Sequence, residues 1–198
     1  MKLNWAERWA VNNPFRVLQQ RIEIRLLKGM VTLPSGARVL EVGCGRGAGA
    51  GLILKKFQPA LLHASDLDWE MIRKARNFLS LEQRGKIILY VGDVLRLPYR
   101  DNAMDAVFVF GVLHHVLDWR SGLAEIARVL KTGGLFFFEE LYPSLYQNVI
   151  TKHILLHPRH DRFFGNDLKA ALKEVNLPLK NALEFKKLGI LGVSIKES

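Results

Sequence analysis

Residues 38–51 read Arg-Val-Leu-Glu-Val-Gly-Cys-Gly-Arg-Gly-Ala-Gly-Ala-Gly, and this stretch decides the fold. Its first five residues, Arg38–Val42, form the apolar, β-branched run that is typical of one buried strand. Glycines at alternate positions, Gly43, Gly45 and Gly47, predict a tight turn, and a helical segment follows as far as Pro59. Such a turn lets a ligand approach the backbone, and the helix start offers unpaired N–H groups. A glycine-rich loop without a ligand is the alternative interpretation of this stretch.

Three later apolar runs each end in a polar or glycine signal. They are residues 60–65, 86–91 and 105–110, followed by Asp66, by Gly92-Asp93 and by Gly111. Asp66 lies 19 residues after Gly47, where nucleotide-binding folds place the carboxylate that binds ribose hydroxyls. Because the carboxyl ends of parallel strands meet at one edge of a sheet, these signals predict a ligand-binding edge. The alternative role for Asp66 and Asp93 is helix capping or turn formation.

Five short motifs follow one another at regular intervals. They are Glu41-Val-Gly-Cys-Gly-Arg-Gly47, Ser65-Asp-Leu-Asp-Trp-Glu-Met71, Gly92-Asp-Val-Leu-Arg-Leu-Pro98, Leu113-His-His115 and Arg128-Val-Leu-Lys-Thr-Gly-Gly134. In order and spacing they resemble the motifs of class I S-adenosylmethionine-dependent methyltransferases, in particular the small UbiE-like branch with a methyltransferase domain of type 11. The resemblance covers residues 37–140. It is specific for the cofactor and much less specific for the methyl acceptor.

The resemblance implies an α/β fold of the Rossmann-like, doubly wound kind: a single domain with a mostly parallel, seven-stranded sheet and helices on both faces. Residues 1–36 are expected to form an N-terminal helical cover and residues 37–140 the cofactor-binding core. Residues 141–198 would supply a substrate-side region and the last strands, 182–185 and 190–195, as an antiparallel pair.

The N-terminal segment, residues 3–28, has helical spacing with a break at Asn13-Pro14 and an end at Gly29. Trp5 and Trp9 lie before the break. After the break, the apolar positions of the predicted helix are Val17, Leu18 and Ile22, and its basic positions are Arg21, Arg25 and Lys28.

Further helices and a strand are predicted from caps and spacing. Asp68 caps a helix after the second strand, and Asp118 begins another that ends at Gly133-Gly134. Residues 95–103 form a loop, residues 135–138 a strand covered on both faces, and residues 167–175 a last helix.

The cofactor site implied by the resemblance binds S-adenosylmethionine and its product S-adenosylhomocysteine. Its residues are Glu41, Gly43, Cys44, Gly45, Asp66, Leu67, Asp93, Val94, Phe110 and Gly111. Asp66 suits the ribose diol, and Asp93 with Val94 suits the adenine amino group and ring. Glu41 and the glycine turn face the amino-acid end. Cys44, the single cysteine, is interpreted as a small residue that contributes backbone and not as a nucleophile.

Methyl transfer is an in-line displacement that depends on alignment and exclusion of water, and only some acceptors need a general base. The candidates are His114 and His115, because histidine accepts a proton near neutral pH. A pair of histidines that only shapes the pocket is our preferred interpretation. His157, His160 and Asp161 form a weak metal pattern, so no metal is predicted.

The charge distribution and the lengths of the apolar runs limit the classes of partner and the location to be expected. The net charge of +10 lies mainly in the flanks: residues 1–38 hold seven basic against two acidic residues, and residues 152–198 hold nine against five. Basic flanks suggest acidic partners, such as phosphate-bearing substrates, anionic lipid surfaces or nucleic acid, and simple solubility is the alternative. The resemblance implies an acceptor that is a small molecule or lipid-like, with quinone-type and anionic acceptors included, and peripheral contact with an anionic membrane is one option. Nucleic acid is not the expected partner. Without an apolar run of ~18–20 residues or a signal core, the expected location is cytoplasmic.

Two other functions stay open. Gly43-x-Gly45-x-x-Ala48 also fits the dinucleotide fingerprint of an NAD-dependent oxidoreductase. Glu41 before the turn disfavours a pyrophosphate there, and about 60 residues after the fifth strand are few for a second catalytic domain. A non-catalytic, cofactor-binding adaptor of the same fold is the other alternative.

Overall fold

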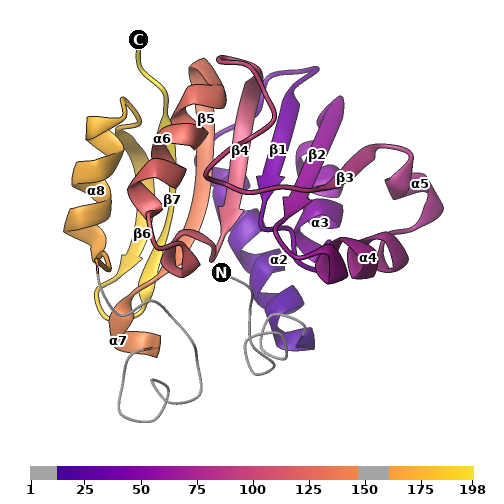
Figure 1. Ribbon diagram of the computed structural model, residues 1–198, viewed down its shortest axis with the longest axis horizontal. Helices are drawn as coiled ribbons and strands as arrows, with labels where there is room; N and C mark the ends of the chain where they lie inside the picture. Colours follow the sequence, from indigo (N-terminus) through magenta and orange to yellow (C-terminus); the bar gives the residue numbers. More distant parts are fainter. Residues whose placement is uncertain (1–12, 147–160) are drawn as a thin grey trace.

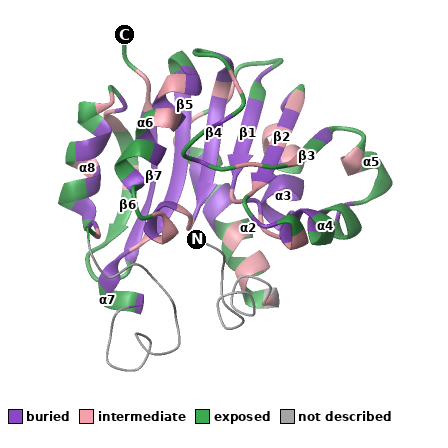
Figure 2. Ribbon diagram, viewed as in Figure 1, coloured by how far each residue is buried: buried purple, intermediate pink, exposed green. Residues whose placement is uncertain are grey.

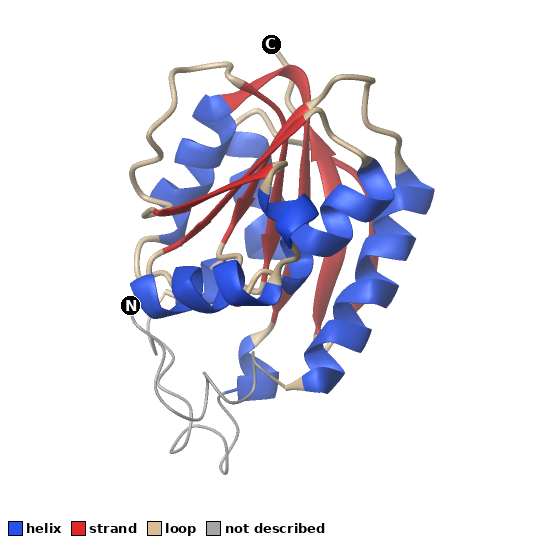
Figure 3. Ribbon diagram, turned by 90° about the vertical axis from the view of Figure 1, so that its right-hand side faces the viewer, coloured by secondary structure: helices blue, strands red, loops and turns tan. Residues whose placement is uncertain are grey.

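A seven-stranded sheet runs through the centre of the protein, and helices cover both of its faces (Figures 1 and 3). The computed structural model describes residues 13–146 and 161–198. The strands are β1 (Arg38–Val42), β2 (Leu61–Asp66), β3 (Ile87–Val91), β4 (Met104–Phe110), β5 (Leu130–Leu141), β6 (Leu179–Phe185) and β7 (Gly189–Ile195). The helices are α2 (Pro14–Met30), α3 (Ala48–Phe57), α4 (Trp69–Phe78), α5 (Leu81–Arg84), η1 (Leu113–His115), α6 (Trp119–Val129), α7 (Pro143–Tyr146) and α8 (Gly165–Glu174).

The strand order is β3-β2-β1-β4-β5-β7-β6. Strands β1 to β5 are mutually parallel, and β7 is antiparallel to both β5 and β6. The predicted mostly parallel, doubly wound, single-domain fold is confirmed. The chain direction across the sheet reverses between β1 and β4, so the loops after these two strands diverge and leave a crevice at their carboxyl ends.

Side chains that alternate along each strand feed two separate hydrophobic clusters, and most of the strand residues are buried (Figure 2). On β1, Leu40 and Val42 pack with residues of α6 and α8, whereas Val39 packs on the opposite face with residues of α2, α3 and α4. On β5, Phe138 and Phe137 divide in the same way. Neighbouring residues of these strands therefore pack on opposite faces of the sheet.

Helix α6 ends earlier than predicted. Asp118 does cap it, accepting a hydrogen bond from the Ser121 N–H at 3.0 Å, but the last helical residue is Val129. The prediction of an end at Gly133-Gly134 is wrong, because this part of the chain already belongs to β5. The Gly133 N–H donates to the Lys196 carbonyl at 2.8 Å, so pairing with the end of the chain holds the segment extended.

Helix α2 begins at the predicted break, since Asn13 caps it by accepting from the Phe15 N–H at 3.0 Å, and it ends at Met30, one residue beyond the predicted end. Two of the predicted apolar positions, Leu18 and Ile22, are exposed. The buried apolar residues of α2 are Ile24 and Leu27, which pack beside α3.

Other local predictions hold with small shifts. Asp68 caps α4 by accepting from the Glu70 N–H at 3.0 Å, and α8 begins at Gly165, two residues before the predicted start. The antiparallel pair β6 and β7 and the loop at 95–103 are present. Trp5 and Trp9 lie outside the described residues, and the subdivision into cover, core and substrate-side region stays a prediction.

Candidate active site

A cavity of about 450 Å³ opens at the carboxyl edge of the parallel strands, beside the divergence of β1 and β4. Nine of the ten residues predicted for the cofactor line it: Gly43, Cys44, Gly45, Asp66, Leu67, Asp93, Val94, Phe110 and Gly111. His115 lines it as well, from η1. The structure thus brings residues from four strand ends together around one space, as the sequence predicts.

The turn after β1 requires glycine for two reasons. Gly43 has a φ of +74°, in the left-handed region that a Cβ disfavours. A Cβ at this position would also overlap the Val112 side chain, which lines the cavity from the other side. At Gly45, with a φ of +53°, a Cβ would meet nothing within 4 Å. The backbone of the turn is therefore directly accessible from the cavity.

Asp66 bridges the glycine turn to the start of α4. Its Oδ2 accepts from the Gly45 N–H and its Oδ1 accepts from the Asp68 N–H, both at 2.9 Å. Burial raises its pKa, and these two backbone donors oppose that rise. A carboxylate has about four acceptor positions, so Asp66 retains capacity for a ligand diol.

Asp93 combines the two roles predicted as alternatives. Its Oδ1 accepts from the Leu95 N–H at 3.0 Å, which forms a turn after β3. The residue is exposed and at the same time lines the cavity, beside the buried Val94. A turn-forming carboxylate is thus positioned at the rim.

Glu41 does not line the cavity, contrary to its predicted position facing the ligand. Its side chain lies on the α2 and α3 side of β1, against Gly49, and is 1% exposed. Its Oε2 has no hydrogen-bond partner among the described residues. Burial, together with the nearby Asp66 charge, raises the pKa of Glu41 to about 8, although Arg16 opposes the rise. The carboxyl is therefore largely protonated at neutral pH.

Cys44 lines the cavity as a buried thiol. Burial is the main reason that its pKa is raised well above its usual value, and the charge of Glu41 adds to the effect. A reactive cysteine needs a stabilised thiolate, which this environment disfavours. The environment agrees with the interpretation of Cys44 as a small structural residue of the turn.

Glu139 anchors α2 over the cavity. Its Oε2 accepts from Arg16 Nη2 at 3.0 Å, and Arg16 Nη1 donates to Glu23 Oε1, also at 3.0 Å. Burial, followed by repulsion from Glu139, raises the pKa of Glu23 to about 7. Arg16 and Gln20 of α2 both line the cavity, so this buried charge cluster fixes the position of α2 as one wall of the cavity.

Glu140, the next residue along β5, points to the opposite face and holds η1. Its Oε1 accepts from the N–H groups of Val112 and Leu113 at 3.2 and 2.8 Å. Its Oε2 is 2.7 Å from His114 Nδ1 and accepts from the His114 N–H at 3.2 Å. His114 is 3% exposed and does not line the cavity. This geometry gives His114 a supporting role and leaves His115 as the histidine that lines the cavity.

Arg162 holds the same loop from the C-terminal part of the chain. It donates to the carbonyl oxygens of His114, Val116 and Leu117 at 2.9, 3.1 and 3.2 Å. Val116 and Leu117 line the cavity, so Arg162 fixes backbone that forms part of its wall.

Several lining residues were not predicted from the sequence: Arg16, Gln20, Val42, Arg46, Ala48, Gly92, Leu95, Val112, Val116 and Leu117. One feature of the sequence could have indicated which residues hold these cavity walls in place: the acidic pair Glu139-Glu140 at the end of the apolar run 135–138. Two adjacent charged residues on a buried strand need partners.

Asp161 pairs with Arg120 Nη1 through both carboxylate oxygens at 2.7 Å, and His157 and His160 lie outside the described residues. Within residues 13–146 and 161–198, no three His, Cys, Asp or Glu side chains are grouped as metal ligands would be.

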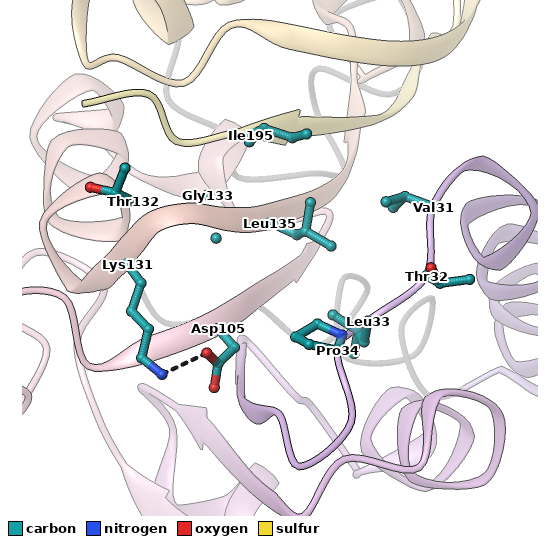
Figure 4. Close-up of a pocket in the computed structure, with 11 residues that line it drawn as sticks. Val31, Thr32, Leu33, Pro34, Asp105, Lys131, Thr132, Gly133, Leu135 and Ile195 are labelled. Atoms are coloured by element: carbon teal, nitrogen blue, oxygen red, sulfur yellow. Dashed lines mark hydrogen bonds and ion pairs between the residues drawn. The ribbon is translucent and has the colours of Figure 1, made fainter.

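A second cavity, of about 510 Å³, lies at the opposite edge of the sheet (Figure 4). It is lined by the segment after α2 and by the first residues of β4 and β5, and Lys131 Nζ pairs with Asp105 Oδ1 there at 2.6 Å. Asp105 also accepts from the Arg38 N–H at 2.8 Å. None of the predicted site residues lines this cavity, and its two charged side chains are paired with each other.

The sheet order is that of the Rossmann-like fold of class I methyltransferases. In agreement, the structure is similar to that of an S-adenosylmethionine-dependent methyltransferase from Aquifex aeolicus, with a TM-score of 0.75, 17% identity, and coverage of 98% of this chain and 99% of that one. At this identity the likeness shows the fold alone.

Residues 40–138 match the family model described as a methyltransferase domain, and the chain belongs to this family, within its UbiE-like type. It is 37% identical over 111 residues to a fatty-acid O-methyltransferase of Mycolicibacterium smegmatis, covering 54% of this chain and 38% of that protein. It is 31% identical over 147 residues to the sterol 24-C-methyltransferase of Aspergillus fumigatus, covering 74% of this chain and 39% of that protein. The chain thus matches less than half the length of these curated relatives.

Proposed function

We propose that the protein transfers a methyl group from S-adenosylmethionine to a small, lipid-like acceptor. One observation carries the proposal: a single cavity has the glycine turn, Asp66 and Asp93 on one side and His115 and Leu117 on the other. The first group suits a nucleoside with a charged tail, and the second leaves room for an apolar acceptor. Membership in the methyltransferase family supports the same chemistry.

The residues around the cavity fit this cofactor. Asp66 and Asp93 offer carboxylate acceptors for a ribose diol and an adenine amino group, and the turn at Gly43 admits a ligand to its backbone. Glu41 lies buried behind that turn and does not line the cavity, so Asp66 and Asp93 are the carboxyl groups that face a ligand with an ammonium and a sulfonium. Bound S-adenosylmethionine supplies an electrophilic methyl carbon on that sulfonium.

The chain's own contribution is positioning and exclusion of water. Arg16 and Glu139 hold α2 as one wall, and Glu140 and Arg162 hold the loop with Val116 and Leu117 as the other. In the transfer, the acceptor atom would bond to the methyl carbon as the carbon–sulfur bond breaks, with the neutral thioether as leaving group. The proton of an acceptor hydroxyl would pass to solvent or buffer. We assign His115 a wall role and no obligatory proton transfer.

A lipid-like acceptor is supported by the apolar rim and by the relatives. Leu95 and Leu117 line the cavity and are 43% and 71% exposed, so apolar surface continues from the cavity to its mouth. Two of the relatives carry the names fatty-acid and sterol methyltransferase.

The described helices include none that is long and apolar enough to cross a bilayer. We place the protein in the cytoplasm, with peripheral contact to an anionic membrane.

Two measurements test the proposal. Calorimetry of the full chain with S-adenosylhomocysteine and with NAD should show binding of the first and none of the second; tighter binding of NAD would overturn the proposal in favour of an oxidoreductase. Transfer of label from methyl-labelled S-adenosylmethionine should then appear in lipid extracts more than in aqueous fractions, and should be lost with Asp66→Ala. Cofactor binding without transfer to either fraction would indicate a non-catalytic adaptor.

A further inference from the structure

The two faces of helix α2 differ in their surroundings: one packs on the domain and lines the cavity, and the other is exposed. Its inner face contributes Arg16 and Gln20 to the cavity and buries Ile24 and Leu27. Its outer face exposes four large apolar side chains: Phe15 (78%), Leu18 (53%), Ile22 (54%) and Leu26 (41%). These four recur at intervals of three or four residues, so they form one continuous stripe along the helix. Such a stripe on a soluble protein marks an interaction surface.

A row of positive charge borders this stripe. Arg21, Arg25 and Lys28 are exposed on α2 and lie at helical spacing next to Leu18 and Ile22. The acidic residue of α2, Glu23, is buried and paired with Arg16, so it does not offset the row. The outer face therefore combines an apolar stripe with positive charge that no acidic residue of α2 offsets within the described part of the chain.

We propose that this outer face of α2 docks on the surface of an anionic lipid bilayer. The proposal rests on the proposed function, because it identifies where a lipid-like acceptor would come from. An amphipathic helix with a basic border lies in the membrane interface with its apolar side chains inserted. Charge complementarity selects this partner: two copies of the same basic face would repel one another, whereas anionic headgroups attract it.

The position of α2 connects the docking face to the cavity. Figure 1 shows the first part of α2 projecting beyond the carboxyl edge of the strands, where the cavity opens. Because Arg16 and Gln20 of the same helix line the cavity, a docked α2 would place the cavity mouth beside the bilayer. The exposed Leu117 and Leu95 lie along that mouth. An apolar acceptor would then reach the site without crossing bulk water.

The test is co-sedimentation of the full chain with phosphatidylcholine vesicles, with and without about 30% phosphatidylglycerol, at about 50 mM and about 500 mM salt. Binding is expected only with the anionic lipid and should weaken at the higher salt. The triple variant Arg21→Gln/Arg25→Gln/Lys28→Gln should lower the partition coefficient about 100-fold at low salt.

Two control variants match these changes on other surfaces. Lys173→Gln/Lys180→Gln/Lys187→Gln removes the same charge from exposed positions on α8, on β6 and just after β6, at the far end of the sheet, and should change binding less than about threefold. Phe15→Ser/Ile22→Ser should weaken binding about tenfold or more, because inserted apolar area is lost. The matching change on α5, Leu81→Ser, should leave binding unchanged although Leu81 is 79% exposed.

Binding of S-adenosylhomocysteine, measured for every variant, separates this inference from the proposed function. None of the substituted residues lines the cavity, so all variants should bind it with unchanged affinity. Normal binding of S-adenosylhomocysteine by the wild type without sedimentation at low salt would overturn the docking face alone. Equal losses from the two triple variants would overturn the assignment to α2. A dimer in size-exclusion chromatography that Ile22→Ser dissociates would show that the face binds a second copy instead.

Discussion

Glu41→Gln should change how the stability of the protein depends on pH. The Glu41 carboxyl is 1% exposed, and its Oε2 has no hydrogen-bond partner among the described residues. Its pKa is about 8 in the folded protein against an ordinary value of 4.5, because burial and Asp66 outweigh the attraction of Arg16. Glutamine has nearly the same shape and no charge, so the substitution removes the titration and leaves the packing.

The sign and size of the effect follow from proton linkage. Between pH 4.5 and about 8 the folded protein keeps a proton on Glu41 that the unfolded chain has lost. The folded state binds more protons, so stability falls as pH rises through this window and levels off above it. A difference of about 3.5 pH units corresponds to at most about 5 kcal/mol. The variant should be similar to the wild type at pH 5 and more stable by about 3–5 kcal/mol at pH 9.

Urea unfolding of the cofactor-free protein at a series of pH values measures this difference directly. Glu23, with a pKa of about 7, affects both proteins in the same direction and cancels in the comparison. Glu82→Gln is the matched control: the side chain is 82% exposed and its ion pair with Lys86 is on the surface, so no pH-dependent difference is expected. Parallel stability curves for the wild type and Glu41→Gln from pH 5 to 9 would refute the reasoning.

Three further predictions concern the cavity itself. Asp66→Ala should weaken S-adenosylhomocysteine binding about 10–100-fold in calorimetry, and should also lower the melting temperature by about 5 °C because two backbone donors lose their acceptor; unchanged affinity would show that Asp66 does not bind the ribose. His115→Ala should reduce turnover less than about tenfold, and the acidic limb of the pH–rate profile should remain. A loss of ~100-fold in turnover, with that limb absent from the profile, would identify His115 as a general base. Gly43→Ala should lower stability by about 2–4 kcal/mol in urea unfolding, because it combines a left-handed backbone with overlap of the Val112 side chain. Gly45→Ala should cost only about 1 kcal/mol of backbone strain, and equal losses from both would contradict the difference in surrounding space.

The glycine turn, the strand endings and most of the candidate cofactor site were predictable from the sequence because their signals are local. Each strand ends in its own glycine or acid, and parallel strands necessarily bring those ends to one edge. That is why the sequence predicts Gly43, Asp66, Asp93 and Gly111 at one ligand edge, and in the structure all four line one cavity. Local hydrogen bonds explain why the caps at Asp68 and Asp118 were also predicted correctly.

The walls of the cavity were decided by contacts between distant parts of the chain. Arg16 meets Glu139 across 123 residues, and Arg162 meets the His114 carbonyl across 48. Residue spacing carries no information on such pairings, so it could not show that Arg16 turns inward while Leu18 and Ile22 face outward. By itself the sequence determined the glycine turn and a ligand edge of a parallel sheet, since strand endings and turn glycines act within a few residues, and its serial motifs indicated the methyltransferase fold by resemblance. Only the tertiary structure decided which charges are buried and which face of α2 is free, because burial depends on every element packed around a side chain.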